Sequence, residues 1–478
     1  MIGPNSRPTT HHRTSMANTS LSNAAMGPLS RRRLLQAAAC GFGFTAFSHL
    51  AQSAQTEGPM APKSPHFTPR AKRVIFMFMQ GGPAQMDLLD YKPELEKLAK
   101  QGFDTRVNGQ RMGGKLLPSP WKFTPAGECG LPVSELLPET ARHADQLCVI
   151  NSMRTDNPAH PQATLMLHTG AINFVRPSMG SWIVYGLGTE NQNLPGFVTI
   201  NPVENLGGVQ NYGSAFLPAT YQGTRVNVGP RPMANLRNQR LSSAEQRQQL
   251  ELIQSMNHDL LEEVDTDPAL EGIIESYELA FRMQSEVPEL MDLSDEPQAV
   301  QAKYGIGDRA TEGFGKQCLM ARRLAEAGVR FIEITHRGWD QHNQLSERLP
   351  ANCRAIDRPI GALLDDLKQR DLLKDTLVIW GGEFGRTPVD QGNGNGRRHN
   401  PSGFTMWMAG GGVKGGLRYG ATDPSGYDAV DNPVHIHDLH ATVLHLLGFD
   451  HTRLTFPYSG RDFRLTDVHG EVVQGILA

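Results

Sequence analysis

The sequence lacks two features that would mark large classes of function. Beyond about residue 54, no stretch reaches the roughly 20 apolar residues that a transmembrane helix requires. The formal net charge is only −3 at pH 7, so the chain has no basic field that would attract nucleic acid. We therefore expect the mature protein to contain no stable membrane span and to bind no nucleic acid.

Cysteine is also scarce. The 478 residues include five cysteines, which are scattered and show no Cys-x-x-Cys spacing: Cys40, Cys129, Cys148, Cys318 and Cys353. The first lies in the N-terminal segment described next, and the pairing of the other four cannot be deduced from their positions. Disulfides and buried free thiols are both compatible with this pattern.

The N-terminal segment has the composition of an export signal. Three arginines, Arg31, Arg32 and Arg33, precede an apolar stretch that contains glycine, and small residues follow it. This order predicts a twin-arginine signal peptide over residues 1–54, which the twin-arginine export machinery would recognise. A short membrane anchor is the alternative, but polar residues interrupt the apolar stretch. The mature protein would then be periplasmic or extracellular.

The rest of the chain has the pattern of an α/β protein. Residues 55–70 are polar and proline-rich and predict a linker, and residues 71–478 suit one large domain. Apolar runs with the length of buried strands alternate with helix-like segments, at residues 74–79, 145–153, 196–200, 328–335, 375–382 and 403–412. This alternation predicts a doubly wound, mostly parallel sheet sandwiched by helices. Amphipathic patterns within residues 235–300 predict a helical insert.

Charged residues follow two of these predicted strands. Glu383 and Arg386 come directly after one strand, and Asp340 and His342 follow another. In open parallel sheets, ligands bind beyond the carboxyl ends of the strands. A carboxylate and an imidazole two residues apart suit zinc, manganese or iron, and arginine suits phosphate or sulfate. The alternative is that Glu383 and Arg386 only neutralise each other.

Three further segments supply candidate site residues. A glycine-rich loop carries His399, which a mobile loop could bring to a metal. His160 lies in the first turn of a predicted helix, where an anion is favoured. Asp87 follows the first strand and could ligate a cation or cap a helix. The segment 434–448 is rich in histidine, but we interpret its Asp438 as a helix cap or packing carboxylate.

Several motifs together resemble one protein family. These are "VIFMFMQGGPAQMDLLDYKPEL" early in the chain, "GWDQHNQ" in its centre, and "GGEFGRTP" and "GNGNGRRHNPSGFTMWMAGGG" later on. Their order resembles the family called domain of unknown function 1501, from about residue 70 to the C-terminus. That family in turn resembles the alkaline phosphatase and sulfatase superfamily. The resemblance implies a parallel sheet between helices, with a metal site at the strand ends.

The resemblance also implies roles for individual residues. His160 aligns with the nucleophile position of the superfamily, and His399 falls where a later histidine or lysine is usual. Glu383 and Phe384 correspond to the first two residues of an Asp-His-Gly metal motif. Because neither cysteine nor serine stands at the nucleophile position, a classical sulfatase is not expected. Because Phe384 cannot ligate, a full two-metal site is not expected either.

The sequence favours an exported, metal-dependent hydrolase of phosphate or sulfate esters, acting on a small molecule or a glycan. Its predicted metal ligands are Asp340, His342, Glu383, His399 and Asp87. The ion would be divalent, such as zinc, manganese or calcium. Arg386 would stabilise developing charge, and His160 would serve as ligand, acid–base group or nucleophile. The alternatives are a non-catalytic envelope protein that binds sulfated or phosphorylated glycans, and a structural or assembly component.

Overall fold

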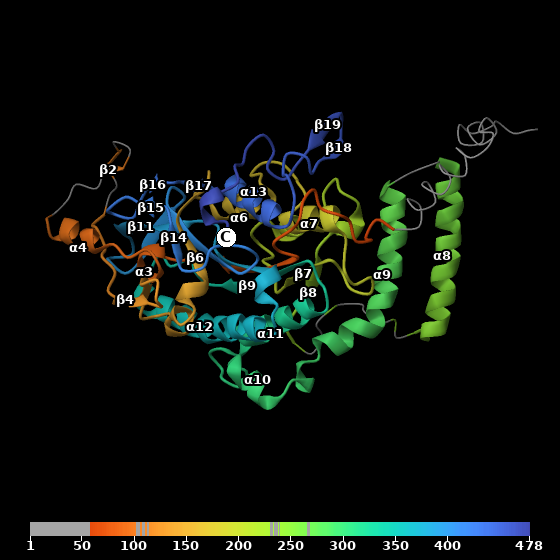
Figure 1. The fold of residues 1–478 in the computed structure, drawn as a ribbon, viewed down its shortest axis with the longest axis horizontal. Helices are drawn as coiled ribbons and strands as arrows, with labels where there is room; N and C mark the ends of the chain where they lie inside the picture. Colours follow the sequence, from red (N-terminus) through yellow and green to blue (C-terminus); the bar gives the residue numbers. More distant parts are fainter. Residues whose placement is uncertain are drawn as a thin grey trace, which may run out of the picture. The chain divides into compact units, whose positions relative to one another are not determined.

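The protein is built around a sheet of nine strands in the computed structural model (Figure 1). The structure describes residues 58–478 apart from gaps at 102–105, 108–109, 112–113, 230–232, 234–237, 239 and 265–267. The predicted signal peptide and the first residues of the predicted linker lie outside this range.

The strands of the sheet run mostly parallel. Their order is β14-β6-β13-β10-β1-β9-β7-β8, and β17 pairs with β6. Only β13 is antiparallel to its neighbours β10 and β6 in this described sheet. The strands are β1 (Arg73–Gln80), β6 (Leu147–Arg154), β7 (Phe197–Ile200), β8 (Thr224–Val226), β9 (Phe331–Arg337), β10 (Thr376–Gly381), β13 (Phe404–Ala409), β14 (Leu417–Tyr419) and β17 (Val434–His435).

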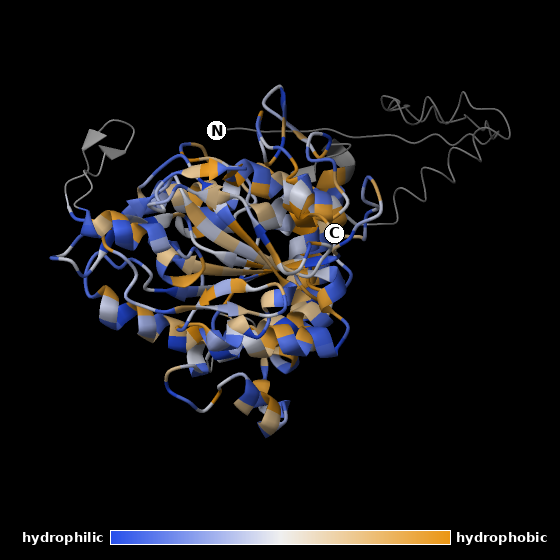
Figure 2. Cartoon of the chain, turned by 60° about the vertical axis from the view of Figure 1, so that its left-hand side comes forward, coloured by the Kyte–Doolittle hydropathy of each residue, from blue (hydrophilic) through white to orange (hydrophobic). Residues whose placement is uncertain are grey.

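Both faces of the sheet are covered. Successive residues of a strand point to opposite faces, and β1 is buried along almost its whole length. Ile75 and Met77 belong to one apolar cluster, and Val74 and Phe76 belong to the other. Figure 2 shows the apolar strands lying between helical layers. The first cluster includes α11 (Glu312–Glu326) and α12 (Leu345–Gln369), and the second includes α6 (His160–Thr169), α7 (Met179–Leu187) and α13 (Ile436–Leu446).

This architecture confirms the predicted doubly wound, mostly parallel α/β fold. The predicted strands are present, although their ends shift by a few residues. Two long helices, α8 (Ser243–Val264) and α9 (Pro268–Met291), lie in the part of the chain where the insert was predicted. The smaller elements are α3 (Gln85–Leu88), α4 (Pro93–Lys100), α5 (Pro138–Ala141), α10 (Gln298–Lys303), β2 (Arg106–Val107), β3 (Gln110–Arg111), β4 (Phe123–Ala126), β5 (Leu131–Ser134), β11 (Gly385–Asp390), β12 (Arg397–Asn400), β15 (Ala421–Thr422), β16 (Ala429–Asp431), β18 (Phe456–Tyr458) and β19 (Arg461–Phe463).

The four cysteines after the N-terminal segment are all free thiols. Cys129 is exposed, whereas Cys148, Cys318 and Cys353 are buried. Burial raises the pKa of the Cys148 thiol to about 12, so this side chain behaves as a small apolar group. Across the described ranges, no helix combines the length and the apolar character needed to cross a membrane.

Candidate metal centre

Four side chains from three parts of the chain meet beyond the ends of the central strands. His160 is the first residue of α6, which follows β6. Asp340 and His342 lie in the connection between β9 and α12. His399 lies on β12, which pairs with β11 just after β10. The parallel strands therefore deliver these residues to one edge of the sheet, as expected for an open α/β fold.

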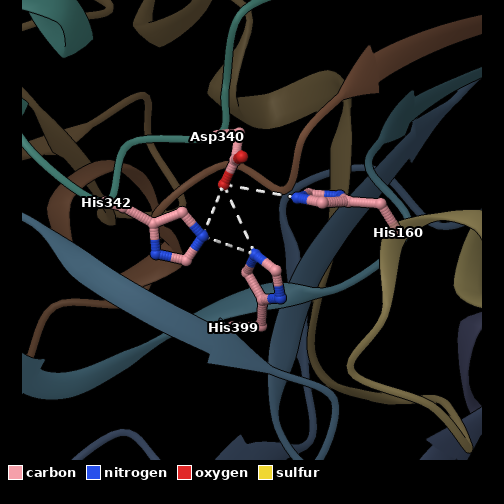
Figure 3. A group of neighbouring side chains, drawn as sticks. All are labelled: His160, Asp340, His342 and His399. Carbon is pink, nitrogen blue, oxygen red and sulfur yellow. Dashed lines mark hydrogen bonds and ion pairs between the residues drawn. The ribbon is translucent and has the colours of Figure 1, made fainter.

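The four side chains point toward a common centre (Figure 3). Oδ1 of Asp340 lies 3.3 Å from Nε2 of His160, 3.0 Å from Nε2 of His342 and 3.3 Å from Nε2 of His399. The Nε2 atoms of His342 and His399 are 2.8 Å apart. One donor atom from each of the four residues lies within 4.8 Å of all the others.

Each histidine is oriented by an acceptor at its second ring nitrogen. Nδ1 of His160 lies 2.5 Å from Oε1 of Glu383, and Nδ1 of His342 lies 2.7 Å from Oε1 of Gln391. Nδ1 of His399 lies 2.6 Å from the carbonyl oxygen of Pro158. A carbonyl cannot donate, and these geometries place the proton on Nδ1. All three Nε2 atoms therefore face the centre, where a cation could bind them and would displace a proton from Nε2 of His160.

The donor set fits a transition-metal ion. Without an ion, a proton on Nε2 of His160 can lie between this ring and Asp340. Once that proton is lost, three ring nitrogens and a carboxylate oxygen this close together would repel one another without a positive charge between them. Donors at about 2.1 Å from a tetrahedral metal are roughly 3.4 Å apart. Four of the six donor pairs here are 2.8–3.3 Å apart, and all six lie within 4.8 Å. Outer acceptors on each histidine are also typical of metal sites.

The electrostatics of the group favour positive charge. Burial opposes a charged imidazole, but hydrogen bonds to Asp340 and Glu383 raise the pKa of His160 to about 9. Partial burial likewise opposes ionisation of Asp340, yet His160, His399 and Arg386 hold the pKa of this carboxyl well below its usual range. The side chain of Asp340 is 39% exposed, so the centre is accessible from solvent.

Glu383 lies behind His160 and outside the group of four. It is fully buried, and both of its carboxylate oxygens accept from the backbone N–H of Gly81 at 3.0 Å. Gly81 has a φ of +117°, and a Cβ there would lie 2.4 Å from the backbone nitrogen of Asp340. A glycine at this position therefore allows β1, Glu383 and the Asp340 loop to approach closely. The structure assigns Glu383 to the orientation of His160 instead of direct ligation.

Arg386 is also buried and already partnered. Its Nε donates to the carbonyl of Gly82 at 3.0 Å, its Nη1 to that of Arg397 at 3.1 Å, and its Nη2 to Oδ1 of Asp340 at 2.7 Å. Each of the three guanidinium nitrogens thus has at least one acceptor within the protein. Within the described residues, Arg386 has no ion pair with Glu383. Arg386 positions Asp340, and its role in stabilising charge on a substrate stays a prediction.

The family model described as "Protein of unknown function (DUF1501)" matches residues 71–477. The chain belongs to this family. Among curated proteins, none matches the sequence.

Several solved structures are similar to this DUF1501 protein. Alkaline phosphatase from the Antarctic bacterium TAB5 is 10% identical, with a TM-score of 0.31, covering 72% of this chain and 92% of the phosphatase. The PsFucS1 sulfatase from Pseudoalteromonas sp. is 13% identical, with a TM-score of 0.33 and coverages of 80% and 68%. The periplasmic domain of EcEptC from Escherichia coli, in complex with Zn, is 10% identical, with a TM-score of 0.34 and coverages of 87% and 98%.

Asp87 is not part of the centre of this DUF1501 protein. Its two carboxylate oxygens pair with Nε and Nη2 of Arg397 at 2.7 and 2.9 Å, and both side chains are fully buried. This pair anchors β12, the strand that carries His399. Asp87 lies outside the group of four whose donor atoms meet, and its contacts make it a support for β12.

Two histidines of the histidine-rich segment, His435 and His440, have structural contacts. His435 and Asp438 form a capping box at the start of α13, in agreement with our interpretation of Asp438. Nε2 of His440 donates to the carbonyl of Leu167 at 2.8 Å. The ring of Phe384 packs against His160 and His399, with ring centroids 4.7 and 4.5 Å away. Phe384 therefore forms an apolar wall of the centre.

Sequence reasoning missed the partners that orient the histidines. Gln391 and the carbonyl of Pro158 hold His342 and His399, and the N–H of Gly81 holds Glu383. No pattern in the sequence distinguishes these groups, because a backbone carbonyl or a lone glutamine has no spacing signature. Only the fold brings them within hydrogen-bond distance of the centre.

Proposed function

We propose that this protein is an exported hydrolase of phosphate or sulfate esters that uses a single divalent metal ion. The observation that carries the proposal is the convergence of three oriented histidines and one carboxylate on an accessible point. His160, Asp340, His342 and His399 would hold the ion. Because three of the four donors are imidazole nitrogens, zinc, manganese or iron suits the centre better than calcium, which prefers oxygen ligands.

The side chains around the centre have distinct roles in this proposal. A bound ion would polarise an ester oxygen and lower the pKa of water. Glu383 keeps the proton of His160 on Nδ1, and Arg386 holds the carboxylate of Asp340 toward the centre. Phe384 excludes water from one side.

Hydrolysis without a covalent enzyme intermediate fits these contacts. His160, which aligns with the superfamily nucleophile, directs Nδ1 to Glu383 and Nε2 to the centre, so neither nitrogen is free to attack an ester. The attacking group is then water, and the substrate is an ester that approaches from the exposed side of Asp340. A small molecule and a glycan both remain suitable substrates.

The test is metal content and turnover measured on the same samples. Mature protein, His342→Ala and His399→Ala would each be stripped with a chelator and reloaded with zinc or manganese. We expect about one ion per chain in the native protein, loss of the ion in both variants, and hydrolysis of p-nitrophenyl phosphate, its diester or the sulfate only with the ion present. His258→Ala is the control, because His258 is exposed on α8.

A metal without turnover would favour the second candidate function. Four protein donors are the usual complement of a structural zinc site, in which no position is left for a substrate. The protein would then be a metal-stabilised envelope protein that binds sulfated or phosphorylated glycans. No bound metal after reloading would contradict both candidates.

A further inference from the structure

A hollow of about 530 Å³ opens between the start of α11 and the ends of β7, β8 and β9. We call it the β9 hollow, and its lining includes Arg309, Gly313, Phe314, Gln317, His336 and Arg337. The three parallel strands end at the edge of the sheet that carries the candidate metal centre. Arg337 is the last residue of β9 and Asp340 follows three residues later, so their Cα atoms are at most about 11 Å apart. The hollow therefore lies beside the centre.

The β9 hollow carries positive charge on its lining. Arg309 and Arg337 both line it, and its described lining contains no aspartate or glutamate. Nη2 of Arg337 donates to the carbonyl of Pro202 at 2.7 Å, which holds this side chain in place. Arg309 is exposed, and its side chain has no hydrogen bond or ion pair within the described residues. The forked guanidinium group suits a sulfate, a phosphate or a carboxylate.

The acids that flank Arg309 and α11 in the sequence are engaged elsewhere. Oδ1 of Asp308 accepts from the N–H of Ala310 at 2.9 Å, and Glu312 pairs with Lys316. Across the described ranges, neither carboxylate forms an ion pair with the two arginines or lines the β9 hollow. The hollow is thus positively charged in a chain whose formal net charge is −3.

The first turn of α11 adds backbone donors. The N–H groups of Gly313 and Phe314 have no acceptor among the described residues. Thr311, the N-cap residue, uses its hydroxyl to donate to the carbonyl of Gly305 and accepts from neither N–H. A Cβ at Gly313 would meet nothing within 4 Å, so the backbone is open to the hollow there. The positive end of a helix dipole favours an anion at this place.

Two side chains of the lining offer further donors. Gln317 is only 6% exposed, and its Oε1 accepts from the N–H of Thr335 at 3.2 Å. Its amide nitrogen has no acceptor in the part of the chain that the structure describes. Nδ1 of His336 accepts from Nε1 of Trp339 at 3.1 Å, so the ring proton lies on Nε2. Buried donors without acceptors cost free energy, and a bound anion would supply the missing acceptors.

We propose that the β9 hollow binds a second anionic group of the substrate, a sulfate, phosphate or carboxylate that is not hydrolysed. The inference rests on the proposed function and names the class of substrate. The metal centre would take the reacting ester, while Arg309, Arg337 and the start of α11 hold the other group. A neutral extension would leave the donors unmatched, and a cationic one would meet two arginines. The substrate is therefore an ester with at least two anionic groups.

Binding of inorganic sulfate tests the hollow without the metal. Calorimetric titration would use the mature full-length protein, stripped with a chelator and held at constant ionic strength. We expect Arg309→Ala with Arg337→Ala to raise the dissociation constant for sulfate about 10-fold or more. Gln317→Glu should do the same, and it keeps the shape of the side chain. Arg453→Ala is the matched control, because Arg453 is exposed after α13 and has no ion pair in the described ranges.

Three results of this titration would overturn the proposal. They are native protein that binds no sulfate up to about 50 mM, sulfate binding that the hollow variants leave unchanged, and an equal loss in the control. Thermal unfolding would show that the variants are folded.

Turnover of a matched pair of esters then tests the substrate class. Fructose 1,6-bisphosphate carries one anionic group more than fructose 6-phosphate, and released inorganic phosphate reports on both. With the metal-loaded protein we expect kcat/KM to be about 10-fold or more higher for the bisphosphate, and we expect the double arginine variant to lose this preference. Equal values in the native protein would overturn the proposal. If no ester is hydrolysed, p-nitrophenyl phosphate included, the proposed function fails, whereas sulfate binding that is lost in the hollow variants would by itself support the anion site.

Discussion

Replacing Glu383 by glutamine tests how the centre is held together. The change keeps the shape of the buried side chain, so it leaves no cavity. It does remove the negative charge and one of the two acceptor oxygens behind His160: Gly81 N–H lies 3.0 Å from both carboxylate oxygens, and the amide nitrogen that replaces one of them cannot accept. If the amide nitrogen faces His160, the imidazole must move its proton to Nε2. That proton would then occupy the position from which His160 binds the ion.

Glu383 contacts the candidate ligand His160 and not the centre itself, so its replacement should lower metal affinity only indirectly. Loss of an outer carboxylate partner typically lowers metal affinity about 10- to 100-fold. This corresponds to roughly 1.4–2.8 kcal/mol of binding free energy. Truncation of a direct ligand such as His342 should cost more, because it removes a bond to the ion. We therefore expect the truncation of His342 to lower metal affinity more than Glu383→Gln does, and this ranking tests the reasoning better than either value alone.

Competition with a chromophoric chelator would measure these affinities. Glu333→Gln is a matched control, because Glu333 is an equally buried carboxylate, 3.3 Å from His168, that does not contact the four candidate ligands. It should lower the free energy of unfolding and leave metal affinity unchanged. Unchanged affinity in Glu383→Gln, or equal losses in both variants, would refute the assignment of Glu383 to the orientation of His160.

Three further outcomes follow from the structure. Gly81→Ala should lower both the melting temperature and the metal content, because its Cβ would meet the Asp340 nitrogen at 2.4 Å. Asp87→Asn leaves the charge of Arg397 buried and unpaired, and urea unfolding should show a loss of about 3–5 kcal/mol. Burial lowers the pKa of His440 from 6.5 to about 3, so only the unfolded chain takes up this proton between those values. Stability should therefore fall as pH drops, by roughly 3 kcal/mol at pH 4 from this group, and His440→Leu should flatten the dependence in urea unfolding.

The fold could be predicted from the sequence because its central strands are buried on both faces. A strand such as β1 must then be apolar at every position, and such runs are easily seen. The direction of β13 could not be predicted, because a buried antiparallel strand among parallel ones has the same composition. Strand ends were also displaced, since the last residues of a strand are set by its neighbours and not by local preference.

The sequence predicted where the candidate site lies, but it predicted the roles of the site residues only in part. Position after a buried strand brought attention to Asp340, His342 and Glu383, and the fold does bring them to one edge of the sheet. Which carboxylate faces the centre depends on contacts between distant segments: Gly81 draws Glu383 behind His160, while Arg386 turns Asp340 toward the centre. The hydrogen-bond donors around a buried carboxylate therefore decide whether it faces the centre or supports another residue. Those donors, Gly81 just after β1 and Arg386 on β11, are more than 40 residues away in sequence from Asp340, so the division between ligand and support arises only in the folded chain.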